Sequence, residues 1–169
     1  MQRILVIGAS GAGKSTLAAE LARRLDLPFF PSDPFYWEPG WKPAPAETVL
    51  RRLDEVLARE RWVLDGNFDD QRKQVWTRAE CVVWLDYSLA TIASRSIRRN
   101  LGLLLNGGPT WSGNRMNAAR AFSGIRHAFR SYGLKRRVYP GWLADLTGVE
   151  VHRLRSPRET EAWTEALLP

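Results

Sequence analysis

Nine residues near the start of the chain form its most specific chemical pattern. Positions 8–16 fit G-x-x-x-x-G-K-[ST], the pattern of a phosphate-binding loop, or P-loop. Glycines let such a loop adopt positive φ angles and bring backbone N–H groups close to an anion. The lysine supplies a positive charge for β- and γ-phosphates, and the serine hydroxyl after it can bind Mg²⁺. We predict that a nucleotide binds to these residues: Gly8, Ala9, Ser10, Gly11, Ala12, Gly13, Lys14, Ser15 and Thr16.

Aspartates at the ends of apolar segments are the next candidates for chemistry. Asp65 follows residues 61–64 and Asp86 follows residues 82–85, and both segments read as buried strands. A carboxylate at such a strand end can hold a water of the Mg²⁺ shell opposite Ser15. Both aspartates therefore compete for the metal role. For Asp65 the alternative interpretation is an Asp-Gly turn that binds nothing.

Asp33 ends a third apolar segment, residues 27–33, and precedes Pro34. Parallel sheets bind ligands at the carboxyl ends of their strands, which would bring Asp33 close to the P-loop. There it could orient or deprotonate an acceptor, or contact Mg²⁺ through water. The alternative is a turn residue before a proline. The aromatic residues 35–41 that follow could stack on a ring of the ligand or cover the core.

The positive charge of the chain is concentrated in one segment. The net charge is +7, yet no acidic residue occurs between Asp86 and Asp145. Arg95 and Arg99 follow a strand that ends on the ligand side of the sheet, so we predict that they contact phosphate. The segment as a whole faces something anionic, either nucleotide phosphates or a nucleic acid backbone. Its ten basic residues are Arg95, Arg98, Arg99, Arg115, Arg120, Arg126, Arg130, Lys135, Arg136 and Arg137.

Strands and helices alternate in the pattern of apolar residues. Apolar runs predict five strands, at residues 4–7, 27–33, 61–65, 82–86 and 149–154. Periodic apolar positions predict helices that open at the P-loop and then span about 46–59, 89–101, 115–131 and 157–168. This order predicts a three-layer α/β/α fold with a five-stranded parallel sheet.

The middle of the chain carries signals for breaks and for a moving part. Gly133 is predicted to end the helix near residue 131, and Pro140 to interrupt the segment after it. Residues 106–114 are small and polar and are typical of a lid hinge or tip. We predict that residues 100–137 form a basic helical lid that closes over the ligands and excludes water.

Length and composition are those of one globular domain over residues 1–169. Apolar residues make up 44% of the chain and charged residues 25%. One cysteine gives neither an internal disulfide nor metal-site spacing. No apolar stretch reaches the roughly 20 residues that span a bilayer, and the first apolar run is too short for a signal peptide. We expect a cytoplasmic protein that does not bind membranes.

Beyond the P-loop, the chain resembles the adenylate kinase-like nucleoside monophosphate kinases. Residues 63–66, Val-Leu-Asp-Gly, are similar to the strand of that family that ends in Leu-Leu-Asp-Gly. Asp86, Arg95 and Arg99 are similar to its next strand-end aspartate and the two arginines that follow on a helix. The resemblance implies that Asp65 is the aspartate linked to Mg²⁺ and that the arginines bind nucleotide at the base of the lid.

One part of that family's pattern is missing. A Pro-Arg pair follows Asp-Gly-Phe in adenylate kinases and helps to hold the acceptor monophosphate. Residues 67–69 read Asn-Phe-Asp here, which argues against AMP as the acceptor. The chain also lacks the Asn-Lys-x-Asp guanine motif, which argues against a regulatory GTPase.

A narrower resemblance is to the P-loop group of DNA topology modulation proteins, FlaR-like. The similar segments are residues 33–37, the Pro-Gly-Trp at 39–41, the Trp-Val-Leu-Asp-Gly-Asn-Phe at 62–68 and the Val-Trp-Leu-Asp at 83–86. The group's name implies a nucleic-acid-binding NTPase or regulator. The basic segment supports this alternative, although the sequence contains no recognised DNA-binding motif.

Together these features favour an ATP-dependent phosphotransferase that uses Mg²⁺ and a small-molecule acceptor. In this hypothesis Ser15 and Asp65 serve the metal, while Lys14, Arg95 and Arg99 neutralise charge on the transferred phosphoryl group. Asp33 lies on the acceptor side and completes the predicted catalytic set. The acceptor itself is not identified by the sequence.

Overall fold

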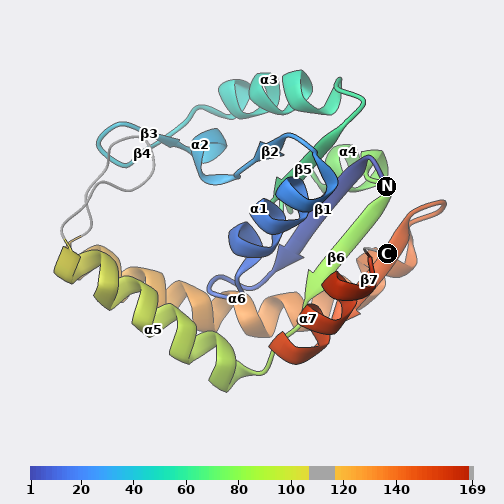
Figure 1. The fold of residues 1–169 in the computed structure, drawn as a ribbon. Coiled ribbons are helices and arrows are strands. Elements are labelled where there is room, and N and C mark those ends of the chain that lie inside the picture. The colour runs from blue at the N-terminus through green and yellow to red at the C-terminus, as the bar shows by residue number, and fades with distance from the viewer. Residues whose placement is uncertain (107–116, 168–169) are drawn as a thin grey trace.

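The computed structural model describes residues 1–106 and 117–167 (Figure 1). Five parallel strands form its main sheet in the order β2-β5-β1-β6-β7. Apolar β-branched residues favour such a sheet because its strands are buried on both faces. The predicted five-stranded parallel sheet is therefore confirmed, with strands β1 Arg3–Gly8, β2 Phe29–Phe30, β5 Trp62–Asp65, β6 Cys81–Leu85 and β7 Glu150–Leu154.

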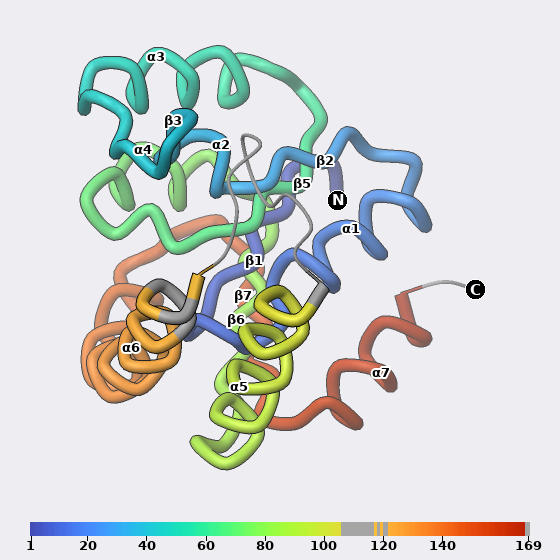
Figure 2. Tube along the Cα trace, turned by 90° about the vertical axis from the view of Figure 1, so that its left-hand side faces the viewer, coloured from blue at the N-terminus to red at the C-terminus, as the bar shows by residue number. Residues whose placement is uncertain are grey.

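Helices cover both faces of the sheet, so the predicted three-layer architecture is also confirmed. Figure 2 shows α1 and α7 to one side of the strands and α3, α4 and α6 to the other. The alternation of β1 accounts for the two layers, because successive residues of a strand point to opposite faces. Ile4 and Val6 pack in the core beneath α1, whereas Leu5 and Ile7 pack beneath α3.

The predicted helices begin within about three residues of their expected starts, and the structure adds the short helices α2, α4 and η1. They are α1 Lys14–Leu25, α2 Asp33–Tyr36, α3 Ala46–Leu57, α4 Arg72–Val75, the 3-10 helix η1 Trp76–Arg78, α5 Leu89–Asn106, α6 Ala118–Ala144 and α7 Pro157–Ala166. A capping box opens α7, since Ser156 Oγ accepts from Glu159 N at 3.1 Å and Glu159 accepts from Arg155 N at 2.6 Å. A small hairpin of β3 Trp37–Glu38 and β4 Lys42–Pro43 follows α2.

The prediction that Gly133 and Pro140 break the middle segment is wrong. Helix α6 continues through both residues as far as Ala144. Tyr139 explains why, because its ring is fully buried against Trp76 and Trp84, with centroids 5.2 and 5.7 Å away. This packing outweighs the weak helix propensities of glycine and proline.

The predicted lid at residues 100–137 falls on the end of α5 and on much of α6. Helices α5 and α6 lie side by side (Figures 1 and 2). From Ala128 onward α6 carries fully or nearly fully buried residues, including Ser131 and Lys135. This part of the predicted lid packs against the rest of the protein, and the lid itself stays a prediction. The predicted hinge at 106–114 lies, beyond Asn106, outside the described residues.

None of the described helices combines the length and apolar character needed to cross a lipid bilayer.

Candidate active site

The P-loop connects β1 to α1 at the carboxyl edge of the sheet. Gly11 and Gly13 have φ angles of 86° and 99°, which only glycine adopts without strain. Gly13 stands immediately before α1, and no side chain caps the first turn of that helix. The N–H groups of this turn are therefore available to an anion, and the helix directs its positive end towards the same point.

Lys14 is the first residue of α1 and folds back over the loop. Its Nζ donates to the carbonyl oxygens of Gly8 at 3.2 Å and Ala9 at 3.3 Å. Burial lowers the pKa of Lys14, and the nearby Asp65 and Asp33 carboxylates oppose that shift. An ammonium group that has lost part of its water shell gains from an anionic ligand, as the motif predicts for phosphate.

Side chains from distant parts of the chain support the loop from behind. Asn67 Oδ1 accepts from Gly8 N at 2.9 Å, and Ser131 Oγ accepts from Ser10 N at 3.2 Å. Arg95 of α5 donates from Nη1 to Ala12 O at 2.8 Å. The loop is thus held in shape by three separate elements of the fold.

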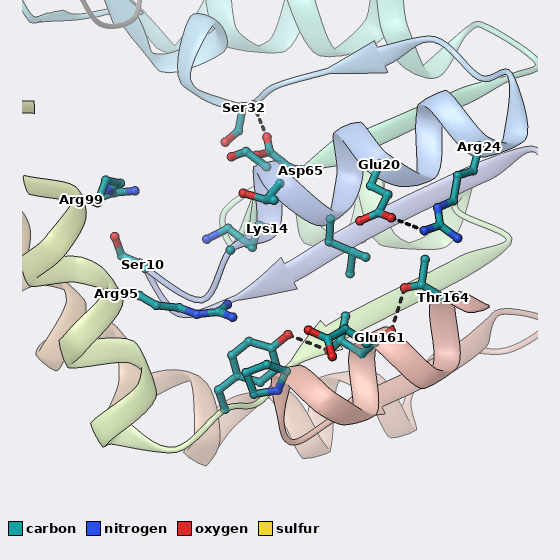
Figure 3. A pocket seen from close by; sticks show the side chains of 18 of the residues that line it. Ser10, Lys14, Glu20, Arg24, Ser32, Asp65, Arg95, Arg99, Glu161 and Thr164 are labelled. Carbon is teal, nitrogen blue, oxygen red and sulfur yellow. Dashed lines mark hydrogen bonds and ion pairs between the residues drawn. The ribbon is translucent and has the colours of Figure 1, made fainter. Parts of the chain in front are cut away.

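Two aspartates lie near the loop, Asp65 at the end of β5 and Asp33 at the start of α2, where the sequence predicts the end of a strand. Asp65 is nearly fully buried at the end of β5, and its Oδ1 accepts from Ser32 N at 2.6 Å. Asp33 begins α2, and burial together with the neighbouring Asp65 carboxylate raises its pKa to about 6. Burial lowers the pKa of Arg99 on α5, and the nearby Asp33 carboxylate opposes that shift. Figure 3 shows Asp65 and Arg99 on the side of the cleft to which Lys14 points. Asp33 is also close enough to affect the pKa of Lys14.

A single cleft of about 710 Å³ connects these groups. One end is lined by Ser32, Asp33, Asp65 and Arg99, and the P-loop forms its middle. The other end runs between α1 and α7 past an ion pair of Glu20 and Arg24 (Figure 3). Of the predicted nucleotide-binding residues, the cleft is lined by Ser10, Gly11, Gly13, Lys14, Ser15, Thr16 and Arg95, whereas Gly8, Ala9 and Ala12 lie buried beneath it.

Asp86, the competitor of Asp65, is engaged elsewhere. Its buried carboxylate pairs with Arg136 of α6 at 3.0 Å and with Arg153 of β7 at 2.6 Å. It does not line the cleft. The geometry therefore favours Asp65 as the aspartate that faces the P-loop.

Ser15 and Asp65 suit a magnesium ion that is shared with phosphates. Within residues 1–106 and 117–167, no cluster of three or more His, Cys, Asp or Glu side chains could hold a metal unaided. Mg²⁺ in phosphoryl-transfer sites commonly takes only one or two protein ligands and completes its shell with phosphate and water. A hydroxyl group and a buried carboxylate that line one cleft fit that pattern.

The aromatic residues 35–41 were predicted either to stack on a ring of the ligand or to cover the core. Phe35 is buried and meets Phe68 edge to face at 5.9 Å, so it covers the core. Trp37 and Trp41 pack against each other on the β3–β4 hairpin, with centroids 5.6 Å apart. Neither tryptophan lines the cleft. Stacking of this segment on a ligand ring stays a prediction.

Sequence reasoning missed Asn67 and Ser131 as supports of the loop. Asn67 directly follows Asp-Gly at a strand end, so its position offered a local signal. Ser131 offered none, because 121 residues separate it from its partner Ser10.

Comparisons with known proteins identify solved structures that share the fold. No family model matches the chain. An uncharacterised protein from Bacillus subtilis, YqaC, is 27% identical over 155 residues, which cover 86% of this chain and 84% of that protein. Shikimate kinase from Bacteroides thetaiotaomicron superposes with a TM-score of 0.60 at 17% identity, over 98% of this chain and 96% of that one. Shikimate kinase from Acinetobacter baumannii, in complex with shikimate, gives 0.57 at 18% identity, over 99% and 91%. The chain therefore has the P-loop kinase fold.

Proposed function

We propose that this protein is an ATP-dependent phosphotransferase that phosphorylates a small hydroxyl-bearing acceptor. The observation that carries the proposal is the arrangement of one cleft. A phosphate-binding loop with its lysine shares this cleft with two carboxylates, Asp65 at the end of β5 and Asp33 at the start of α2, and with Arg95 and Arg99. The kinase fold shared with the two shikimate kinases supports the same class of reaction.

The proposed reaction is a direct transfer. The acceptor hydroxyl lies beside Asp33, which takes its proton as the oxygen attacks the γ-phosphorus of ATP. The bond between that phosphorus and the β,γ-bridging oxygen breaks, and ADP leaves with the electron pair. Lys14, Arg95 and Arg99 neutralise charge on the moving phosphoryl group. Ser15 and Asp65 would hold Mg²⁺, which supplies further positive charge to the phosphates when bound.

The raised pKa of Asp33 suits a proton acceptor. A carboxylate with a pKa of about 6 is ionised at neutral pH, yet it is more basic than an ordinary aspartate. Burial and the Asp65 charge are the causes, so this basicity comes from the site itself. We also propose that the predicted lid excludes water from the cleft during the transfer.

The alternative of a nucleic-acid-binding NTPase has less support. Lys135 and Arg136 pair with Asp69 and Asp86 inside the fold. Arg95 and Arg99 line the cleft. Four of the ten basic residues of the middle segment thus have partners or roles within the protein. The resemblance to the FlaR-like group stays a prediction.

The test is ADP release from Mg²⁺·ATP with candidate acceptors. Separate pools of nucleosides, nucleoside monophosphates and small alcohols are compared with duplex DNA and with no addition. Stimulation by one small-molecule pool supports the proposal, and subdividing that pool names the acceptor. Stimulation by DNA alone, lost steeply as salt is added, would favour the alternative instead.

A further inference from the structure

Helix α6 contacts the P-loop through the side chain of Ser131. Its hydroxyl group accepts a hydrogen bond from Ser10 N at 3.2 Å and donates one to Ala128 O at 3.0 Å. Ser131 is nearly fully buried, so water does not readily take the place of its hydroxyl group. The hydroxyl thus satisfies an N–H group of the loop on the side away from the cleft.

The same face of α6 is anchored by an acid at the next two turns. Lys135 Nζ pairs with Asp69, and Tyr139 Oη donates to Asp69 Oδ1 at 3.0 Å. Residues 131, 135 and 139 follow one another at single-turn spacing, so they share one face of the helix. Asp69 belongs to the segment after β5, four residues beyond Asp65. Asp69 therefore anchors this face of α6 in the two turns after Ser131.

This arrangement explains residues 67–69, which stand where adenylate kinases have another sequence. Asn67 supports Gly8 N of the P-loop. Asp69 anchors the helix whose Ser131 supports Ser10 N. Both contacts hold the first half of the loop, while the N–H groups at the start of α1 stay available to phosphate.

We propose that Ser131 is a positioning residue for the phosphate-binding loop and that Asp69 acts through it by anchoring α6. The inference rests on the proposed binding of ATP to this loop. Without the Ser131 hydroxyl, Ser10 N loses its partner and the loop leaves the shape in which its N–H groups converge. Phosphate binding weakens as a result, although Ser131 itself does not line the cleft.

The first test measures binding of ATP and of inorganic tripolyphosphate by calorimetry. Loss of the hydrogen bond to the partly buried Ser10 N–H group predicts that Ser131→Ala raises both dissociation constants by about 5- to 30-fold. Ser123→Ala is the matched control, because Ser123 lies exposed on the same helix. It should bind both ligands as the wild type does, and thermal unfolding without ligand checks that both variants are folded.

Wild-type affinity in a folded Ser131→Ala variant would overturn the positioning role and leave the proposed function intact. A wild-type protein that binds neither ATP nor tripolyphosphate would overturn the proposed function itself. The two failures are therefore distinguishable. Tripolyphosphate isolates the loop, because it makes no contact that depends on a nucleoside.

The second test is a double-mutant cycle. Asp69→Asn removes the charge that holds Lys135 but keeps an acceptor for Tyr139. It should weaken tripolyphosphate binding by about threefold or more, and the Ser131→Ala/Asp69→Asn variant should be weaker than wild type by less than the product of the single effects. If the double variant weakens binding by the full product of the single effects, Asp69 does not act through Ser131, and the proposed role of Asp69 is overturned.

Discussion

Replacing Asp86 by Asn should destabilise the protein without weakening nucleotide binding. The Asp86 side chain is 1% exposed and accepts charge-assisted hydrogen bonds from Arg153 Nε at 3.0 Å and Nη2 at 2.6 Å. Arg136 Nε lies 3.0 Å from its other oxygen. These contacts join the end of β6 to α6 and β7, at a place that does not line the cleft.

The magnitude follows from how much of this network is shielded from water. Breaking a fully buried ion pair costs about 3–5 kcal/mol. Arg136 and Arg153 are 47% and 36% exposed, so both can recover hydration when the carboxylate is lost. Asparagine also keeps one acceptor. We therefore expect a loss of about 2 kcal/mol, which for a chain of this length lowers Tm by about 4–8 °C.

The assay compares Asp86→Asn with Asp65→Asn by thermal unfolding and by calorimetry with Mg²⁺·ATP. Asp65→Asn should change Tm less than Asp86→Asn does. The amide can still accept from Ser32 N, and relief of the repulsion with Asp33 offsets the loss of the charge that stabilises the Lys14 ammonium. The turnover of Asp65→Asn should fall by about 10- to 100-fold through weaker support of the metal. The opposite pattern, with turnover lost in a stable Asp86→Asn variant, would refute the assignment of the two aspartates.

Four further predictions concern the cleft. Lys14→Ala should abolish most ATP affinity in calorimetry, and unchanged binding would contradict the P-loop assignment. Asp33→Asn should slow phosphoryl transfer and leave the affinity for ATP unchanged. If the rate and the affinity both equal those of the wild type, Asp33 is only a turn residue. NMR titration of the free protein should give Asp33 a pKa of about 6, and an ordinary aspartate pKa would contradict this. Because Asp33 must be ionised to accept a proton, activity should fall as the pH drops below that value. Gly13→Ala should cost about 1–2 kcal/mol and displace Arg95, because its Cβ would lie 2.9 Å from Nη1 at a φ of 99°; a wild-type Tm would contradict it.

The sheet and the P-loop could be predicted because their signals are local. A buried parallel strand reads as a continuous apolar run, as residues 82–85 do, and the loop needs its glycines and lysine at fixed spacing. The parallel sheet and its two helical layers then follow from the alternation of strands and helices, whereas the order of the strands was not predicted.

The supports of the site could not be predicted, because their partners are far apart in the chain. Asp86 reads like Asp65 in sequence, and only the fold brings Arg136 and Arg153 to it. Helix α6 was misjudged at Gly133 and Pro140 for the same reason. Its continuity depends on burial of Tyr139 and on the anchor at Asp69, neither of which is visible in local propensity.

Transfer of the γ-phosphoryl group is the central claim, and isotope labelling tests it most directly. The protein is incubated with a pool of small metabolites and ATP that carries ¹⁸O in its γ-phosphoryl group, and the products are separated by mass spectrometry. We predict that the label enters one hydroxyl-bearing small molecule with the wild type and not with Lys14→Ala. Label found only in inorganic phosphate, with or without DNA, would contradict the account.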